Sequence, residues 1–362
     1  NIYKNYLMAT FHKVNIQKVI KETADAVSLV FKIPGNLKSK FAFHAGQYLT
    51  LKKTINGKEV RRAYSICSSP TDNFIKVAIK AVENGTFSTY ATTELKSGNF
   101  IEISEPEGKF ILETKTNKNY IAFAAGSGIT PVLSMVKDVL ENETTSTFTL
   151  IFGNKTAEDT IFKNELDALK EVNPDRFNLH YVYSREQQED TLFGRVDTEK
   201  TNFYINNYKN ITFDAAYLCG PEEMINEVSS ALSKHGFTDK NIHFELFTAS
   251  VDEDAAAEVK DGTTEITVLL DDEETTFIMQ QTDDILAASL RNNLDAPYSC
   301  QGGVCSSCLC KVTEGKAVMV KNSILSDEEI EEGLVLACQA HPTTAKISID
   351  FVLIEVSNIP TL

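Results

Sequence analysis

Tyr298-Ser299-Cys300-Gln301-Gly302-Gly303-Val304-Cys305-Ser306-Ser307-Cys308 places three cysteines in one short stretch, and a fourth, Cys338, follows after a long gap. This Cys-x4-Cys-x2-Cys spacing with a distant fourth cysteine is the plant-type pattern of a [2Fe–2S] cluster, which four thiolates hold. The Gly302-Gly303 pair lets the backbone come close to the inorganic sulfides, where a Cβ atom would collide. The pattern predicts metal ligands at Cys300, Cys305, Cys308 and Cys338.

A structural zinc site is the alternative interpretation of these four cysteines. Zinc ligands usually come as two short Cys-x2-4-Cys pairs, whereas here they come as three and one, so the spacing favours the cluster. The other cysteines, Cys67, Cys219 and Cys310, lie apart from one another in the sequence and show no disulfide framework. Such usage is typical of a reducing compartment, and we expect a cytoplasmic protein.

Charge is distributed unevenly along the chain, whose formal net charge is −16. Residues 251–362 hold 21 acidic and six basic residues, a balance of −15, while the first 250 residues hold 30 and 29. The asymmetry indicates separate domains and a charged docking surface, and a solvated face is an equally good explanation. Nucleic acid is a poor partner for an acidic surface. No signal peptide and no apolar stretch of ~20 residues is visible, so we expect no membrane partner.

The 362 residues suggest two or three domains. The segment 251–262 is small, polar and acidic, and it predicts a linker. Upstream, strand-rich sequence gives way to alternating strands and helices near residue 115. We therefore expect an antiparallel β-barrel at 8–114, an α/β Rossmann-like domain at 115–250, and an α+β domain of the β-grasp ferredoxin type at 263–362.

The first domain carries two short motifs that together predict a flavin site. Alternating apolar residues and frequent turns predict a closed antiparallel barrel. Arg62-Ala63-Tyr64-Ser65 offers a guanidinium for a phosphate, a ring to stack on a flavin and a hydroxyl for hydrogen bonding. Gly85-Thr86-Phe87-Ser88 opens a predicted helix whose free N–H groups form an anion site. Either motif alone arises by chance, but the pair in one barrel is more specific.

The second domain contains two glycine turns that follow predicted strands. The strand Tyr120–Ala125 runs into Gly126-Ser127-Gly128-Ile129-Thr130-Pro131. Thr130 suits the N-cap of the next helix and Pro131 its first position. The usual Gly-x-Gly-x-x-Gly dinucleotide motif is absent. Cys219-Gly220-Pro221 forms the second turn. A sheet of such units binds its ligand at the carboxyl ends of its strands.

Taken in order, Arg-x-Tyr-Ser, Gly-x-x-Ser, Gly-x-Gly-Ile-Thr-Pro and Cys-Gly-Pro resemble the motifs of the ferredoxin–NADP reductase superfamily. With a plant-type ferredoxin motif at the C-terminus, the chain resembles the reductase components of multicomponent oxygenases. Among these it is most similar to the reductases of di-iron phenylacetyl-CoA epoxidases, from about Ala9 to the end. The resemblance implies that NADPH supplies electrons, that FAD and the [2Fe–2S] cluster carry them, and that a separate di-iron oxygenase complex accepts them.

The resemblance also implies roles for matched residues around the flavin. Arg62 contacts the flavin phosphates, and Tyr64 and Ser65 face the isoalloxazine, with Ser65 near N5. Phe247 matches an aromatic residue near the flavin, and core packing is nearly as good an explanation of it. The ribityl and pyrophosphate are lined by Lys80, Gly85, Thr86, Phe87 and Ser88.

For the nucleotide, the resemblance places Cys219 near the hydride-donating carbon, and a buried small hydrophobic residue is the alternative. Ser65 and Cys219 are therefore the predicted catalytic residues. Ser184 and Arg185 follow a strand where the superfamily contacts the adenosine ribose; an arginine there accommodates a 2′-phosphate, which favours NADPH. The other implied nucleotide contacts are Gly126, Gly128, Thr130, Pro131, Gly220 and Pro221.

Other functions fit parts of the same pattern. The same reductase chemistry can serve another acceptor, such as an aromatic-ring dioxygenase or a steroid hydroxylase, and FMN can replace FAD. A different class is a non-catalytic iron–sulfur or zinc interaction protein on a reductase-like scaffold. Such a protein would lack flavin absorbance and would not oxidise NADPH.

Overall fold

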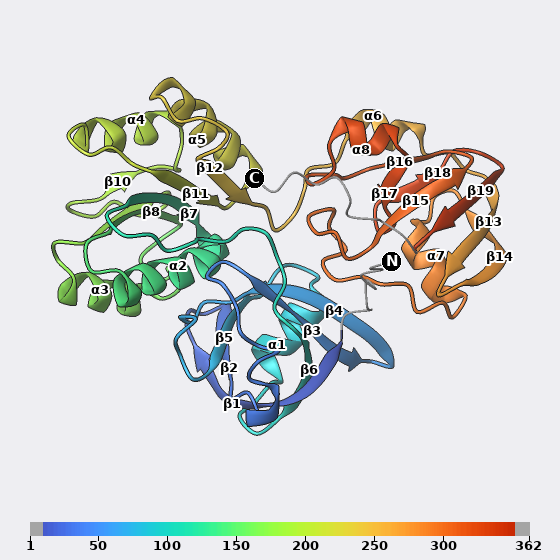
Figure 1. Ribbon diagram of the computed structural model, residues 1–362, viewed down its shortest axis with the longest axis horizontal. Helices are drawn as coiled ribbons and strands as arrows, with labels where there is room; N and C mark the ends of the chain where they lie inside the picture. Colours follow the sequence, from blue (N-terminus) through green and yellow to red (C-terminus); the bar gives the residue numbers. More distant parts are fainter. Residues whose placement is uncertain (1–9, 352–362) are drawn as a thin grey trace. The chain divides into compact units, whose positions relative to one another are not determined.

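A computed structural model describes residues 10–351 of the chain (Figure 1). It divides into one unit of residues 11–247 and another that includes Thr10 and the chain from Thr248 onward. The predicted domain start at residue 8 lies outside the described residues. Within residues 10–351, no helix has both the length and the apolar character needed to cross a bilayer.

The first part of the 11–247 unit is a closed antiparallel barrel, as predicted. Its sheet has the strand order β4-β3-β6-β1-β2-β5. An isolated bridge between Ile66 and Val77 joins the chain beyond β4 to β5 and closes the sheet. The interior is filled by buried aliphatic and aromatic residues such as Leu29, Phe31 and Leu51. The elements are β1 (Phe11–Lys21), β2 (Ala26–Phe31), η1 (Gly35–Leu37), β3 (Tyr48–Ile55), β4 (Lys58–Ser65), β5 (Ile75–Lys80), α1 (Thr86–Thr93) and β6 (Phe100–Ser104).

The second part is a six-stranded parallel sheet with the order β10-β9-β8-β7-β11-β12. Helices α2 and α3 cover one face, and α4 and α5 cover the other (Figure 1). This is the predicted Rossmann-like arrangement. Its elements are β7 (Asn119–Ala125), η2 (Gly126–Gly128), α2 (Ile129–Asn142), β8 (Thr147–Asn154), α3 (Lys163–Val172), β9 (Phe177–Tyr183), β10 (Leu192–Phe193), α4 (Thr198–Asn207), β11 (Ala215–Cys219), α5 (Glu222–Lys234) and β12 (Ile242–Glu245).

The start of α2 differs from the prediction. The N-cap is Gly128 and the helix begins at Ile129, so Thr130 and Pro131 already lie inside the first turn. The 3-10 turn η2 coils the chain before the helix begins, and Thr130 Oγ1 donates to the Ser127 carbonyl at 3.0 Å. Pro131 is tolerated because N–H groups in the first turn have no helical partner.

Buried polar contacts join the barrel to the domain that contains the parallel sheet, which we call the nucleotide-type domain. The Glu165 carboxylate lies between Lys76 of the barrel, at 2.7 Å, and Lys137 of α2. Ser134 Oγ of α2 donates to the carbonyl of Ser68 at 2.7 Å. Because a charge taken out of water is stable only with its partners, these contacts hold the two domains in one arrangement.

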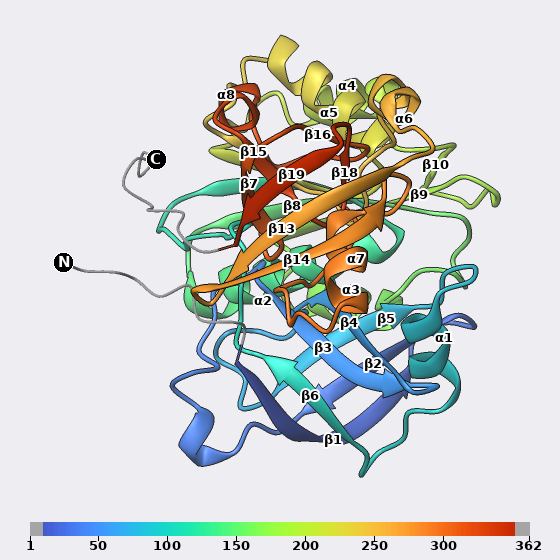
Figure 2. The same ribbon diagram turned by 90° about the vertical axis from the view of Figure 1, so that its right-hand side faces the viewer.

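The C-terminal unit has the β-grasp fold that was predicted. Its five-stranded sheet has the order β14-β13-β19-β15-β17, and α7 lies beside it (Figure 2). Ile266, Val268, Leu286 and Ile349 are among its buried core residues. The elements are α6 (Glu253–Glu258), β13 (Thr263–Leu270), β14 (Glu273–Gln280), α7 (Ile285–Arg291), β15 (Leu309–Glu314), β16 (Ala317–Met319), α8 (Asp327–Glu331), β17 (Leu334–Leu336), β18 (Ala340–Pro342) and β19 (Lys346–Asp350).

The segment predicted as a linker contains the short helix α6. The Asp252 side chain caps this helix by accepting from the Ala255 N–H at 3.0 Å, and three alanines favour its interior. The segment is also hydrogen-bonded within its unit, from Asp252 N–H to the Val320 carbonyl at 2.8 Å. The C-terminal unit includes the chain from Thr248 onward, so the predicted linker 251–262 lies inside this unit and does not connect two units.

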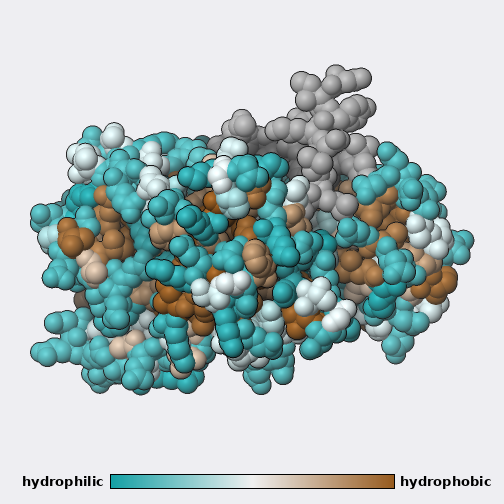
Figure 3. Space-filling model, turned by 90° about the horizontal axis from the view of Figure 1, so that it is seen from below, coloured by the Kyte–Doolittle hydropathy of each residue, from teal (hydrophilic) through white to brown (hydrophobic). Residues whose placement is uncertain are grey.

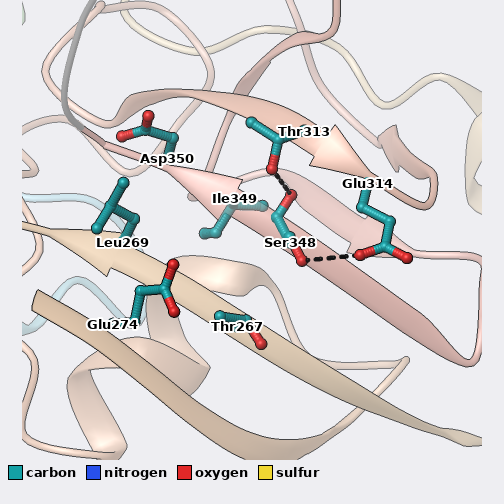
Figure 4. A pocket seen from close by; sticks show the side chains of 8 residues that line it. All are labelled: Thr267, Leu269, Glu274, Thr313, Glu314, Ser348, Ile349 and Asp350. Carbon is teal, nitrogen blue, oxygen red and sulfur yellow. Dashed lines mark hydrogen bonds between the residues drawn. The ribbon is translucent and has the colours of Figure 1, made fainter.

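Polar and charged side chains cover most of the face shown in Figure 3, with hydrophobic side chains between them. In the C-terminal unit, a cavity of about 300 Å³ opens on the sheet (Figure 4). Ser348 Oγ donates to Glu314 at 3.3 Å, and the Ser348 carbonyl accepts from Thr313 Oγ1 at 3.2 Å. The lining of this cavity contains no cysteine, so the cavity is separate from the predicted cluster ligands. The lining residues are Thr267, Leu269, Glu274, Thr313, Glu314, Ser348, Ile349 and Asp350.

Candidate redox site

The predicted flavin residues of the first motif lie at the end of β4. Side chains alternate along a strand, so Arg62 and Tyr64 share one face and Ser65 is on the other. Ser65 is buried, and Tyr64 packs its ring against that of Phe87 at a centroid distance of 5.7 Å. Burial raises the pKa of the Tyr64 hydroxyl above its ordinary value of 10.0, so the ring is neutral. A neutral, partly exposed ring is suited to stacking on a flavin.

The second flavin motif forms the N-terminus of α1, as predicted. Gly85 is the N-cap, and the cap has no side-chain hydrogen bond. A Cβ atom at Gly85 would lie 2.3 Å from Ser88 Oγ and 2.5 Å from Val82 Cγ2, so a side chain does not fit there. The N–H groups of Thr86 and Phe87 belong to the first turn, where a helix attracts anions. The turn therefore remains the predicted contact for the pyrophosphate of FAD.

Two other predicted flavin contacts are already engaged by the protein. Ser88 Oγ accepts from the Val82 N–H at 3.2 Å and donates to the Gly85 carbonyl at 3.4 Å. Lys80 Nζ lies 3.6 Å from an Asp25 carboxylate oxygen. Ser88 therefore shapes the glycine turn. A cavity of about 320 Å³ borders the same turn, and it is lined by Ile55, Asn56, Asn84, Gly85, Thr86, Thr89, Tyr90 and Glu94.

The two predicted catalytic residues meet at one side chain that the sequence analysis missed. Ser65 Oγ lies 3.1 Å from Glu245 Oε2. Cys219 is the direct register partner of Glu245 in the parallel pair of β11 and β12. Burial raises the pKa of Glu245 to about 8, against the lowering effect of the Ser65 hydrogen bond. Ser65, Cys219 and Glu245 therefore form one cluster where the barrel meets the nucleotide-type sheet.

Cys219 itself is fully buried, and burial raises the pKa of its thiol well above 9.0. The thiol is neutral and is no nucleophile. Phe247, two residues after Glu245, is 38% exposed, so it is not a core residue. That exposure favours the predicted flavin contact over the packing alternative. In the sequence, only the position of Glu245 two residues before Phe247 could have drawn attention to it. Its pairing with Ser65 is a tertiary contact that the sequence does not show.

The glycine turns come together at the carboxyl ends of the parallel strands. A Cβ atom at Gly128 would lie 2.1 Å from the carbonyl oxygen of Cys219, so only glycine lets these two turns approach. Gly126 has a φ of +54°, which glycine adopts easily. Gly220 is less restricted, because a Cβ atom there would lie 2.6 Å from Met224 Cε, the movable end of a flexible side chain. Pro221 is the N-cap of α5. Both turns lead into helix N-termini, which attract phosphate groups, so they remain the predicted nucleotide contacts.

Ser184 and Arg185 lie farther along the same sheet edge, beyond β9. The Ser184 N–H donates to the Asn154 carbonyl, and the Arg185 N–H donates to the Lys155 carbonyl, both at 2.9 Å. Lys155 and Arg185 are both exposed, so two cations stand on neighbouring loops. Strand β9, which precedes Ser184 and Arg185, is separated from β11 by β8 and β7. An extended dinucleotide can therefore contact both ends of this edge.

The four predicted cluster ligands lie in one loop and just after β17. Cys305, Cys308 and Cys338 are buried, and Cys300 is partly exposed. The Ala337 N–H donates to the Cys308 carbonyl at 2.9 Å, which ties the two ligand segments together. In the described residues, no three His, Cys, Asp or Glu side chains surround a single ion position. A [2Fe–2S] cluster divides its four thiolates between two irons.

The backbone of the cysteine loop fits a cluster. Gly303 has a φ of +74°, and a Cβ atom there would lie 2.8 Å from the Lys321 carbonyl oxygen. The Gly302 N–H donates to Cys300 Sγ at 3.3 Å, as it would to a ligating thiolate. Cys310 instead lies in the core of the unit on β15, paired in register with Val335. The donor set and the glycine-dependent turn both fit four-thiolate ligation.

Sequence families match each part of the chain. Residues 13–111 match the oxidoreductase FAD-binding domain, residues 123–230 match the oxidoreductase NAD-binding domain, and residues 268–343 match the 2Fe-2S iron-sulfur cluster binding domain.

Relatives match the chain over nearly its whole length. The chain is 39% identical over 350 residues to one component of the 1,2-phenylacetyl-CoA epoxidase of Escherichia coli (strain K12), covering 95% of this chain and 98% of the relative. It is 33% identical to the ferredoxin reductase component of 3-ketosteroid-9-alpha-monooxygenase of Rhodococcus rhodochrous, covering 93% and 96%. Among solved structures, phthalate dioxygenase reductase aligns with a TM-score of 0.66 at 24% identity, over 94% of this chain and 98% of that one, which shows the shared fold.

Proposed function

The chain belongs to the family of oxygenase reductases that combine FAD-binding, NAD-binding and [2Fe–2S] domains, and we propose that it passes electrons from NADPH to a di-iron phenylacetyl-CoA epoxidase. It is an oxidoreductase, and its cofactors are FAD, a nicotinamide nucleotide and a [2Fe–2S] cluster. FAD accepts two electrons together, and the cluster handles them singly. The protein's own residues bind, orient and shield these groups.

The observation that carries the proposal is the Ser65–Glu245 hydrogen bond beside Cys219. The Ser65 hydroxyl comes from the barrel, and Glu245 and Cys219 come from adjacent strands of the nucleotide-type sheet. A flavin on the barrel and a nicotinamide on the sheet would meet at this cluster. Ser65 would hold the reacting ring edge in place, and the buried Cys219 would leave room beside it while excluding water. Glu245 would orient the Ser65 hydroxyl.

The cations beyond β8 and β9 support NADPH as the nucleotide. Lys155 and Arg185 present two positive charges at the predicted ribose position, and a 2′-phosphate gains from both. The nearby acid Glu186 stays ionised, but its carboxylate is held by hydrogen bonds to its own and the neighbouring loop. Its oxygens accept from the Ala157 N–H at 2.8 Å and from Gln188 Nε2 at 2.6 Å, and these bonds lower its pKa. The carboxylate therefore points to the protein's own loop.

The choice of acceptor rests on the relatives. An oxygenase is the electron acceptor in this family, and the relative at 39% identity is a component of phenylacetyl-CoA epoxidase. A ketosteroid monooxygenase is the alternative acceptor, supported by 33% identity over nearly the whole chain. The scattered cysteines support a reducing, cytoplasmic compartment for either role.

Reconstitution tests the proposal. The purified chain, loaded with FAD and cluster, is mixed with NADPH and either a purified phenylacetyl-CoA epoxidase oxygenase or a 3-ketosteroid-9-alpha-hydroxylating oxygenase. We expect NADPH-dependent epoxide formation from phenylacetyl-CoA, with little product from the steroid. Faster turnover with the steroid oxygenase would assign the chain to that system. A protein that carries no flavin absorbance and oxidises no NADPH would support the non-catalytic alternative.

A further inference from the structure

Gln339 is a buried polar residue directly after the predicted cluster ligand Cys338. It is 8% exposed. Its backbone is fixed on both sides, because its N–H donates to the Leu336 carbonyl at 2.8 Å and its carbonyl accepts from the Val320 N–H at 3.0 Å. A buried side-chain amide needs partners, since an unpaired one costs about 1–3 kcal/mol. The partners it has are both parts of the cluster-binding loops.

The Gln339 side chain bridges the two segments that supply the cysteines. Nε2 donates to the Gln301 carbonyl at 3.1 Å, and it lies 3.9 Å from Cys338 Sγ. Gln301 has a φ of +54°, a left-handed conformation that non-glycine residues rarely adopt. The hydrogen bond from Gln339 therefore holds the loop at the residue where its backbone is strained.

The Gln301–Gly302 peptide group extends this contact to a second sulfur. Its carbonyl accepts from Gln339, and its N–H donates to Cys300 Sγ at 3.3 Å. Hydrogen bonds in a chain polarise one another, so a carbonyl that accepts makes its own N–H a stronger donor. One side-chain amide thus acts directly on Cys338 and, through one peptide group, on Cys300.

We propose that Gln339 sets the reduction potential of the [2Fe–2S] cluster by directing N–H groups at two of its cysteine sulfurs. The inference rests on the assignment of Cys300 and Cys338 as ligands. Reduction adds a negative charge to the cluster, and N–H donors to its sulfurs stabilise that charge. Gln339 therefore favours the reduced cluster, which helps the cluster to accept electrons.

Gln281 provides a matched control in the same unit. Its Nε2 donates to Thr264 Oγ1 at 3.1 Å and to the Thr344 carbonyl at 3.4 Å. It is also partly buried, and it contacts no cysteine through these bonds. Loss of its amide disturbs the unit without removing a donor from the cluster.

The test compares Gln339→Met with Gln281→Met in the full-length protein. The midpoint potential of the cluster is measured by EPR during a titration with redox mediators and dithionite. We expect Gln339→Met to lower the equilibrium constant for cluster reduction about tenfold, a shift of ~59 mV toward negative potential for a one-electron couple. Gln281→Met should leave the potential unchanged. An unchanged potential in Gln339→Met with an intact cluster overturns the proposal.

Gln339→Glu provides a second measurement if the methionine variant assembles no cluster. At neutral pH its carboxylate has the length of glutamine but no N–H, so the potential should again move to more negative values. A shift in the opposite direction would reject the role of Gln339 in the potential. Loss of the cluster from both variants would make Gln339 an assembly residue and would also reject that role. The titration uses neither NADPH nor an oxygenase, so a wrong acceptor in the proposed function does not affect it.

Discussion

Ser65 and Glu245 are hydrogen-bonded, Oγ to Oε2 at 3.1 Å, although 180 positions separate them in the chain. The bond joins the barrel to the edge strand of the nucleotide-type sheet. Because burial raises the pKa of Glu245 to about 8, the carboxyl is protonated over most of the physiological range. The contact therefore couples the hydroxyl that is predicted to face the flavin to a side chain whose charge changes near pH 8.

Ser65→Ala should slow NADPH oxidation with ferricyanide as acceptor by about 10- to 100-fold in kcat. The physical reason is the loss of one hydrogen bond at the reacting edge, worth about 1.5–3 kcal/mol if it serves a charged group. Steady-state assays with NADPH measure the change. Ser97→Ala is the control, since Ser97 Oγ donates to the Gln17 carbonyl at 2.6 Å on the exposed surface of the barrel. Equal rates in the two variants would exclude the role of Ser65.

Glu245→Gln should change how stability depends on pH. The folded protein holds the Glu245 proton with a pKa of about 8, and the ordinary value is 4.5. Its contribution to stability is therefore fully present below about pH 4.5 and is lost as the pH rises through about 8. Glutamine remains neutral and shows no such loss. The Tm of the wild type, relative to that of the variant, should fall from about pH 5 to about pH 9; a constant difference would contradict the pKa shift.

Arg185→Ala and Lys155→Ala should each weaken the use of NADPH. We expect a loss of about 1.5–3 kcal/mol in kcat/KM for each, the range for a hydrogen bond to a charged group, with little change for NADH. Lys209→Ala is the control, because Lys209 is an exposed cation in the turn just beyond α4 and is not among the predicted nucleotide contacts. A wild-type enzyme that prefers NADH would refute the assignment.

Serine substitution at Cys300, Cys305, Cys308 or Cys338 should abolish the visible and EPR signals of the [2Fe–2S] cluster. Cys310→Ser should keep them, because Cys310 is a core residue of β15. Its cost should appear as a lower Tm, since a hydroxyl is placed in an apolar core. Loss of the signals in the Cys310 variant, with retention in one of the other four, would require a different ligand set.

Local patterns predicted the site better than long-range pairing did. The Cys300–Cys308 spacing and the glycine turns at Gly128 and Gly220 are local motifs, so a few consecutive residues were enough to predict their chemistry. The pairing of Ser65 with Glu245 depends on how the barrel packs on the sheet, and no local periodicity encodes it. The same holds for Gln339, whose partner Gln301 lies in another loop.

Secondary-structure boundaries failed where one local preference overrode another. Thr130 and Pro131 have the right chemistry for a helix start, but the preceding 3-10 turn had already begun to coil the chain. The acidic segment after residue 250 has the composition of a linker, yet Asp252 caps the helix Glu253–Glu258. The predicted linker segment therefore contains a short helix that its acidic composition did not reveal.

A fragment that ends at Phe247 tests whether the cluster is the electron outlet. The unit of residues 11–247 is compact by itself, and it contains the predicted FAD and NADPH contacts. The fragment should therefore bind FAD and reduce ferricyanide with NADPH. It should fail to support the oxygenase, because the single-electron carrier is absent.

In the full-length protein, added salt should slow oxygenase-coupled turnover. The charge balance of −15 beyond residue 250 favours a charged docking surface, and the screening length of charges falls to ~8 Å near physiological ionic strength. Ferricyanide reduction by the fragment should respond much less to salt, and it is the control for effects on the flavin site. Full oxygenase support from the fragment would show that electrons bypass the cluster.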